Sequence, residues 1–115
     1  MGKIERFEDI IAWQRAKELV LGVYGVFEGI RDYGFKGQIE RAAVSIMNNI
    51  AEGFERQSNK EFKQFLYISK GSCAEVRSML HLSKDLNFIS EEQAEQLIAS
   101  TEEISKMLSN FIKKL

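Results

Sequence analysis

The side chains best placed to bind something are basic and repeat at a fixed spacing. Four of them stand seven residues apart, namely Lys63, Lys70, Arg77 and Lys84. At about 100° per residue, a step of seven drifts only about 20° around a helix axis, so on a helix they form one gently winding row. Arg56 and Lys60 extend the row at its start. Such a row could follow the phosphates of a nucleic acid. The alternative is an ordinary solvated flank of a helix.

Residues typical of a metal or catalytic centre do not combine into one. A di-metal bundle site needs Glu-x-x-His on two helices, but the single histidine, His81, has Ser78 three residues before it. Cys73 falls among apolar positions, where a thiol packs as a small hydrophobe with a raised pKa. Glu52 could face inward on a structural hydrogen bond or lie exposed, and no second carboxylate at a fixed spacing supports acid–base catalysis. We expect no enzyme activity, no cofactor and no metal.

Helices must position these side chains, and apolar residues at steps of three and four predict four of them. The expected ranges are about 9–30, 38–54, 59–86 and 91–114. Short connections between them predict an all-α fold, an antiparallel up-and-down four-helix bundle over residues 1–115. The first connection is expected at 31–37, which carries two glycines among polar residues.

Local signals mark the later helix ends. Ser58 with Glu61, and Ser90 with Gln93, have the spacing of capping boxes, in which two side chains satisfy backbone donors at a helix start. Asn87 is expected to adopt a left-handed conformation after the third helix.

Composition limits the class of protein. The chain has 115 residues, 44% apolar residues and a formal net charge of −1, so one domain fits and any attraction to nucleic acid must come from a local patch. No apolar run is long enough for a membrane span, and the first ten residues lack the layout of a secretory signal. A single cysteine excludes an internal disulfide. We expect a cytoplasmic protein without membrane contact.

Two features favour self-association. The segment 19–27 is apolar almost all round, which implies burial on more than one side. Small residues line the outer side of the helix over 59–86, where glycine costs about 1 kcal/mol relative to alanine and a close backbone contact would explain it. The expected interface residues are Tyr24, Tyr67, Gly71, Ala74 and Ser78. The alternative is tight contact within one bundle.

Several segments together identify a family resemblance. They are FEDIIAWQRA at 7–16, QIERAAVSIMNNIAEGFER at 38–56, SNKEFKQFLYISKGSCAE at 58–75 and DLNFISEEQ at 85–93. They resemble the four-helix bundle proteins encoded in intervening sequences of large-subunit ribosomal RNA genes. That family is in turn similar to the accessory variability proteins of diversity-generating retroelements.

The resemblance implies a small bacterial cytoplasmic bundle that assembles into a ring-like homopentamer. In the retroelement members the ring is similar to a basic adaptor for a reverse transcriptase and nucleic acid, and the family offers no catalytic motif to carry over. This chain departs from the pattern at Met47, where members usually carry a kink-forming proline. It also departs in its charge, with 16 Lys and Arg against 17 Asp and Glu.

The leading hypothesis is therefore a non-enzymatic homo-oligomeric adaptor that binds RNA, DNA or a nucleic-acid enzyme such as a reverse transcriptase. The alternative is a protein-only assembly module that recruits one protein partner without nucleic acid.

Overall fold

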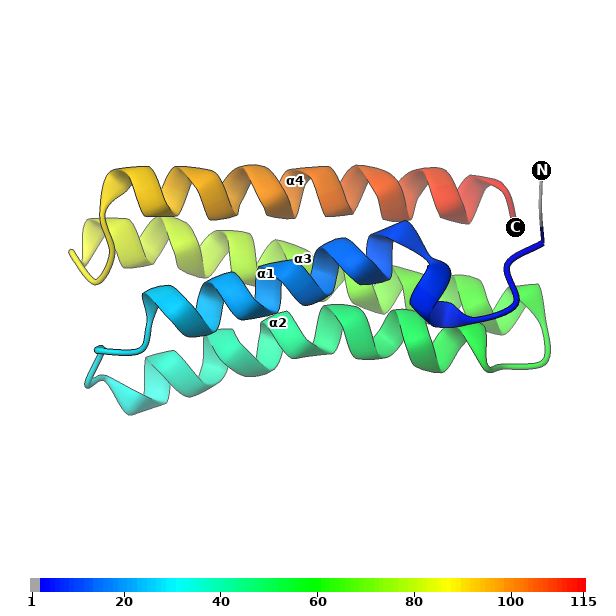
Figure 1. Cartoon of the computed structure of the whole chain (residues 1–115), viewed down its shortest axis with the longest axis horizontal. Coiled ribbons are helices and arrows are strands. Elements are labelled where there is room, and N and C mark those ends of the chain that lie inside the picture. Colours follow the sequence, from blue (N-terminus) through cyan, green and yellow to red (C-terminus); the bar gives the residue numbers. More distant parts are fainter. Residues whose placement is uncertain (1–2) are drawn as a thin grey trace.

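Four antiparallel helices form an up-and-down bundle in the computed structural model, which describes residues 3–115 (Figure 1). A 3-10 turn, η1 (Phe7–Asp9), precedes the helices α1 (Ile11–Val26), α2 (Tyr33–Phe54), α3 (Asn59–Asp85) and α4 (Glu91–Lys113). Within residues 3–115 there is no strand. The predicted all-α four-helix bundle is confirmed.

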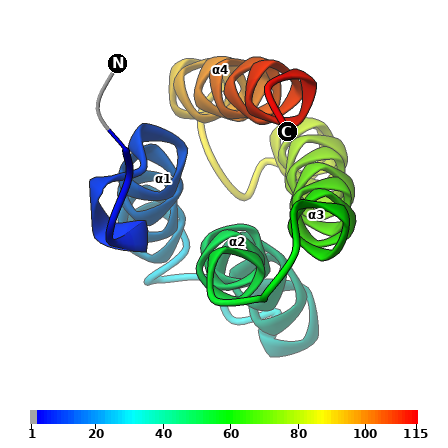
Figure 2. The same cartoon turned by 90° about the vertical axis from the view of Figure 1, so that its right-hand side faces the viewer.

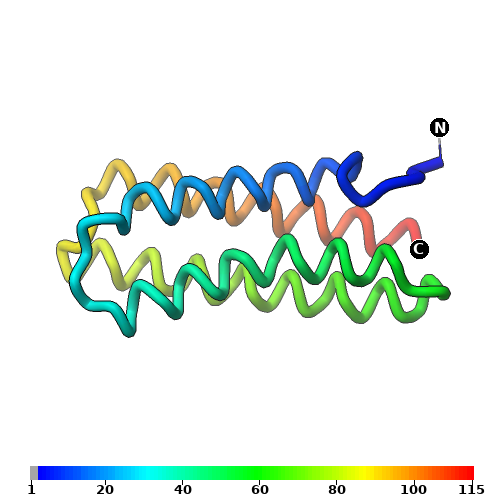
Figure 3. The backbone as a smooth tube through the Cα atoms, turned by 60° about the horizontal axis from the view of Figure 1, so that its bottom comes forward, coloured from blue at the N-terminus to red at the C-terminus, as the bar shows by residue number. Residues whose placement is uncertain are grey.

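The helices follow one another around the bundle axis (Figure 2). Both α1 and α3 pack against α2 and α4, so α1 and α3 lie diagonally opposite each other. The α1–α2 and α3–α4 connections share one end of the bundle, whereas the α2–α3 connection, the lead-in before α1 and the C-terminus lie at the other end (Figure 3).

The apolar faces predicted from the sequence meet in one core. Each helix contributes residues with almost no exposed surface, for example Val23, Ile46, Leu66 and Ile104. The hydroxyl of Ser69, also fully buried, donates to the carbonyl oxygen of Ile46 at 2.9 Å and so links α3 to α2. This buried polar group is therefore satisfied by a hydrogen bond.

The first helix is shorter than the predicted range 9–30. At its start, Asp9 belongs to η1 and Ile10 is extended, so α1 begins at Ile11. At its end, α1 stops at Val26, and the next residue, Phe27, lies in a turn with its ring fully buried. The prediction was wrong here because an apolar residue in a turn can be buried in the core just as a helical one can.

The second helix begins earlier than the predicted residue 38. Asp32 caps it, with Oδ1 accepting a hydrogen bond from the backbone N–H of Phe35 at 3.1 Å. The ring of Phe35 then packs against those of Phe27 and Phe88, at centroid distances of 6.1 and 5.3 Å. The predicted connection at 31–37 was wrong because this cap and these ring contacts outweigh the low helix propensity of two glycines.

The expected caps of the later helices are present, with one difference. Ser90 and Gln93 form the full reciprocal box, whereas at Ser58 only the serine half is present, its hydroxyl accepting from the Glu61 N–H. Asn87 has φ of 61°. Its N–H and that of Phe88 bond back into the last turn of α3, which is the pattern of a Schellman motif.

Two further observations concern the helices as a whole. Helix α2 is continuous through Met47, where the resemblance leads one to expect a proline. Among the described helices, none combines the length and apolar character needed to cross a membrane.

Candidate nucleic-acid interface

The predicted basic row lies along the seam between α3 and α4. The ammonium group of Lys70 donates to the hydroxyl of Ser109 on α4 at 2.7 Å. The guanidinium of Arg77 lies 3.9 Å from the carboxylate of Glu102, also on α4. Lys63 and Lys84 are half-buried. The structure thus brings these four residues to one flank of α3.

The position of the row follows from the core pattern of α3. Each basic residue comes directly after a buried one, in the pairs Phe62–Lys63, Ser69–Lys70, Val76–Arg77 and Ser83–Lys84. A residue that follows a core position lies about 100° around the axis, at the edge of the core face. From there a long side chain covers apolar surface with its stem and keeps its charged end in water.

Charge compensation differs along the row. Arg77 faces a carboxylate, and the first turn of α4 near the same end of the bundle carries Glu91 and Glu92. Lys70 faces a neutral hydroxyl, which leaves its charge uncompensated by that contact. The half of the row nearer the start of α3 is therefore the more positive half.

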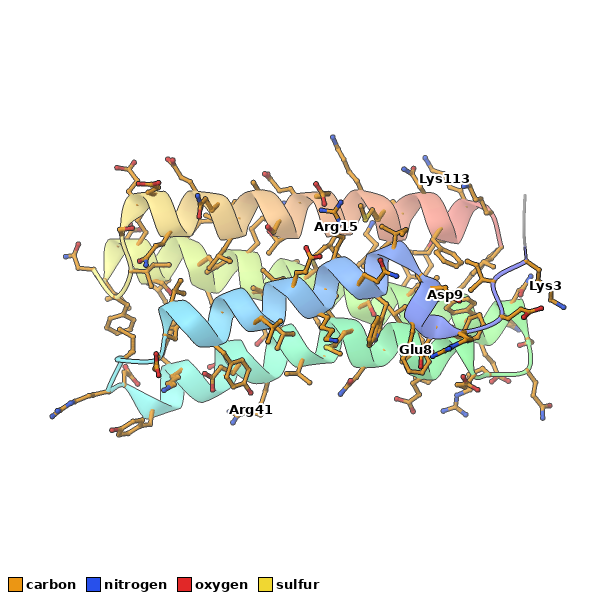
Figure 4. All side chains as sticks on the ribbon, viewed as in Figure 1. Lys3, Glu8, Asp9, Arg15, Arg41 and Lys113 are labelled. Atoms are coloured by element: carbon orange, nitrogen blue, oxygen red, sulfur yellow. The ribbon has the colours of Figure 1, made fainter. Side chains whose placement is uncertain are left out.

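Helix α4 adds two lysines that the sequence analysis missed. Ser109 and Glu102 face α3, and Lys106 lies three residues from one and four from the other, so it shares their flank. Lys113 follows Ser109 by four residues and lies near the C-terminal end of α4 (Figure 4). Their own spacing of seven was the signal that could have revealed them. We call Lys63, Lys70, Lys106 and Lys113 the lysine cluster.

Arg56 does not join this flank. It lies in the α2–α3 connection, with its guanidinium 4.8 Å from the ring centre of Phe65 and 3.5 Å from Glu52 on α2. Those contacts hold its guanidinium beside Phe65 and Glu52, so it does not continue the row along the α3–α4 seam. Glu52 itself is exposed, so of the two alternatives for this residue the inward-facing one is wrong. Lys60 is exposed in the first turn of α3.

A second surface lies on the outside of α3, and we call it the α3 outer face. Its exposed members are Tyr67, Ile68, Gly71, Ala74, Ser78 and Leu82. A Cβ atom added to Gly71 would have no other atom within 4 Å. Tight packing within one bundle, the alternative explanation for this glycine, is therefore wrong. Ile68 and Leu82, which the sequence analysis did not select, enlarge the apolar part of this face.

Exposed apolar residues also lie on the diagonal helix. Leu21 and Tyr24 of α1 are 64% and 47% exposed, and we call them the α1 patch. The segment 19–27, for which burial on more than one side is predicted, is thus covered only on its core side within the single chain. The expected interface residues lie on two separate sides of the molecule.

The remaining candidates for chemistry are unsuited to it. The thiol of Cys73 donates to the Thr101 carbonyl oxygen at 3.0 Å, and burial raises its pKa to about 11. At neutral pH it is therefore protonated and a poor nucleophile. His81 is exposed on α3. Over residues 3–115, no three His, Cys, Asp or Glu side chains converge as metal ligands would.

Comparisons with known proteins agree with this architecture. Residues 8–110 match the family model described as 23S rRNA-intervening sequence protein. The chain has no match among curated proteins.

A solved structure has the same fold. It is the crystal structure of a protein of unknown function from the S23 ribosomal protein family of Bacteroides thetaiotaomicron. The similarity has a TM-score of 0.84 and 25% sequence identity, and it covers 89% of this chain and 98% of that one. Because the family model spans most of the sequence, the chain belongs to the 23S rRNA-intervening sequence protein family.

Proposed function

We propose that the protein is a non-enzymatic, homo-oligomeric adaptor that binds nucleic acid through the lysine cluster. The observation that carries the proposal is the contact of Lys70 with Ser109 across the α3–α4 seam, because helical spacing places Lys63, Lys106 and Lys113 on the same flanks of the two helices. Neutralising phosphates releases condensed counterions, so affinity falls steeply with salt. Four contacts correspond to a slope of log K on log salt of about −3 to −4.

The overall charge makes this a local interaction. With a formal net charge of −1, the whole molecule does not attract a polyanion from a distance. Binding by one protomer is then weak at physiological salt, where the screening length is about 8 Å. Phosphate contacts are expected only on the part of the flank between the start of α3 and the Arg77–Glu102 pair.

Oligomerisation would compensate for this weakness. The α1 patch and the α3 outer face lie on diagonal helices, so they suit a heterologous contact in which one protomer's patch meets its neighbour's face. Such contacts close into rings when the rotation allows it. A ring repeats the lysine cluster once per protomer, and multivalent binding raises avidity without any new contact. The pentamer that the resemblance implies is one such ring.

A second candidate is a protein-only assembly module. It is favoured by the near balance of charges and by the carboxylate that neutralises Arg77. In this case the ring recruits a protein, and the flank is a solvated surface. A nucleic-acid enzyme such as a reverse transcriptase is the partner class that the resemblance adds to both candidates.

The test is binding of single-stranded DNA and of structured RNA, followed by fluorescence anisotropy at about 50 and 200 mM salt. For four contacts the affinity is expected to fall about 50- to 150-fold between these conditions. The double variant Lys63→Glu, Lys70→Glu should abolish binding. Lys17→Glu with Arg41→Glu is the matched control, since both residues are exposed on α1 and α2 and the charge change is equal.

Two outcomes contradict the nucleic-acid part. One is no binding at low salt, and the other is an equal loss in both double variants. Capture of one specific protein that survives high salt and nuclease treatment would then support the protein-only module.

A further inference from the structure

The core is open at one end of the bundle because α1 is short. Helix α1 has 16 residues, whereas α2, α3 and α4 have 22, 27 and 23. At 1.5 Å per residue, α1 is shorter than the other three by about 9 to 16 Å. The three longer helices extend past the start of α1 at the end that holds the α2–α3 connection (Figure 1). There the fourth side of the bundle is formed only by the lead-in before α1.

A cavity of about 680 Å³ opens at this position, and we call it the end pocket. Its walls include Phe54, Phe62 and Phe111, whose rings meet edge to face at centroid distances of 6.0 and 5.3 Å. Met107 and Ile11 add further apolar surface. A largely apolar cavity of a few hundred Å³ with a small number of polar groups is typical of a small-molecule site.

The charged residues that line the end pocket are mostly basic. Among the charged side chains, Lys3, Arg56 and Lys114 stand against a single carboxylate, that of Asp9. Lys3 and Asp9 both lie at this end of the molecule (Figure 4). Arg56 is partly compensated by Glu52. Neither Lys3 nor Lys114 makes an ion pair within residues 3–115, so their charges remain available to an anion.

We propose that the end pocket binds a small amphiphilic monoanion, a carboxylate on an alkyl or aromatic body. The body packs on the phenylalanine rings, and the carboxylate lies toward Lys3 and Lys114. A second copy of the chain fits less well, because pairing two identical ends would bring lysines against lysines. This site is separate from the lysine cluster, and it does not depend on the proposed function.

Isothermal titration of the full chain with dodecanoate, below its micelle concentration, tests the proposal. We expect one molecule bound per protomer. Decanoate, with two fewer methylenes, should bind about tenfold more weakly if the alkyl chain is buried. Dodecyltrimethylammonium, which has the same chain and the opposite charge, should bind more weakly than dodecanoate. No binding of dodecanoate, or equal binding of the cation, would overturn the proposal.

Paired variants locate the site. Lys3→Gln with Lys114→Gln should weaken dodecanoate about fivefold, the effect expected for two solvent-exposed charges. Lys106→Gln with Lys113→Gln removes the same charge from residues that do not line the end pocket, and it should leave dodecanoate binding unchanged. The second pair should instead weaken nucleic-acid binding, so failure of either proposal can be recognised without the other.

A substitution that fills the cavity provides an independent test. Asn110 is exposed and lines the end pocket. Asn110→Trp should abolish dodecanoate binding, whereas Asn110→Ala should retain it. Unchanged binding in the tryptophan variant contradicts the site. Dissociation of an oligomer by the same variant would make a second copy the occupant and would also overturn the proposal.

Discussion

Gly53 and Gly71 lie on neighbouring helices and have opposite surroundings. A Cβ on Gly53 would lie 2.6 Å from the Cβ of Phe65 and 3.0 Å from a ring atom of Phe62, whereas one on Gly71 would have no other atom within 4 Å. The two glycines therefore show how tightly each side of α3 is packed. The side toward α2 requires a missing side chain for close packing, while the outer side carries a costly glycine that nothing in the protomer explains.

The largest effect is expected at the close contact. Gly53→Ala should lower the free energy of unfolding by about 3 kcal/mol, because the nearest atom is a Cβ that no change of rotamer can move away. Chemical denaturation measures the difference. A neutral or stabilising result would mean that α2 and α3 can separate at low cost, and the contrast between the two sides would disappear.

The pH dependence of stability probes the inner side of α3 through Cys73. Its pKa is raised from 9.0 to about 11 by burial, so the unfolded chain loses the thiol proton first as the pH rises. The contribution of this group is complete below pH 9 and is lost as the pH approaches 11, and it amounts to at most about 3 kcal/mol.

The control for this prediction is Cys73→Ala, which should flatten the fall in stability over that pH window. Denaturation curves at several pH values give the two slopes. Identical slopes in both proteins would show that the thiol is more hydrated than its position beneath α4 implies.

The matched substitution on the outer side should have the opposite sign. Gly71→Ala should raise the stability of the protomer by about 0.8 to 1.0 kcal/mol, the difference in helix propensity, because the added methyl group meets no other atom. If the α3 outer face is an interface, the same variant should weaken self-association in sedimentation experiments. A loss of protomer stability would contradict the open surroundings of this residue.

The smallest effect is expected at the ion pair on the α4 flank. Arg77→Gln should change the free energy of unfolding by less than about 0.5 kcal/mol, because both partners are about half exposed and 3.9 Å apart. Arg15→Gln, which breaks the 3.2 Å pair with Glu103, is the control and should behave alike. A loss above about 1 kcal/mol in Arg77→Gln alone would mean that the Arg77–Glu102 pair contributes substantially to the packing of α3 against α4.

Much of the fold could be predicted because its determinants are local. Steps of three and four place Ile46 and Leu66 on core faces whatever the neighbouring helices are. The serine and asparagine caps at residues 58, 87 and 90 act within one turn, and all three were recognised. The start of α2 was missed although its Asp32 cap is local, because two glycines lower the helix propensity there and the rings that hold Phe35 come from two other parts of the chain.

The candidate site was predicted only in part for the same physical reason. Spacing alone put the four basic residues of α3 on one flank, but which neighbour that flank meets is a tertiary property. The fold set Arg77 against Glu102, drew Arg56 toward Phe65, and left Lys70 beside a hydroxyl. The net charge along the row depends on partners from α4, which are distant in sequence. The spacing of the basic residues alone therefore could not predict which half of the row remains positive.

The sequence by itself determined four amphipathic helices, their inward faces and most of their ends, because these depend on contacts between residues a few positions apart. Only the tertiary structure decided that Gly53 is tightly packed while Gly71 is open, and that a short α1 leaves an apolar cavity at one end. Those outcomes depend on how helices of unequal length align with one another, and the spacing of residues within one helix does not contain that information.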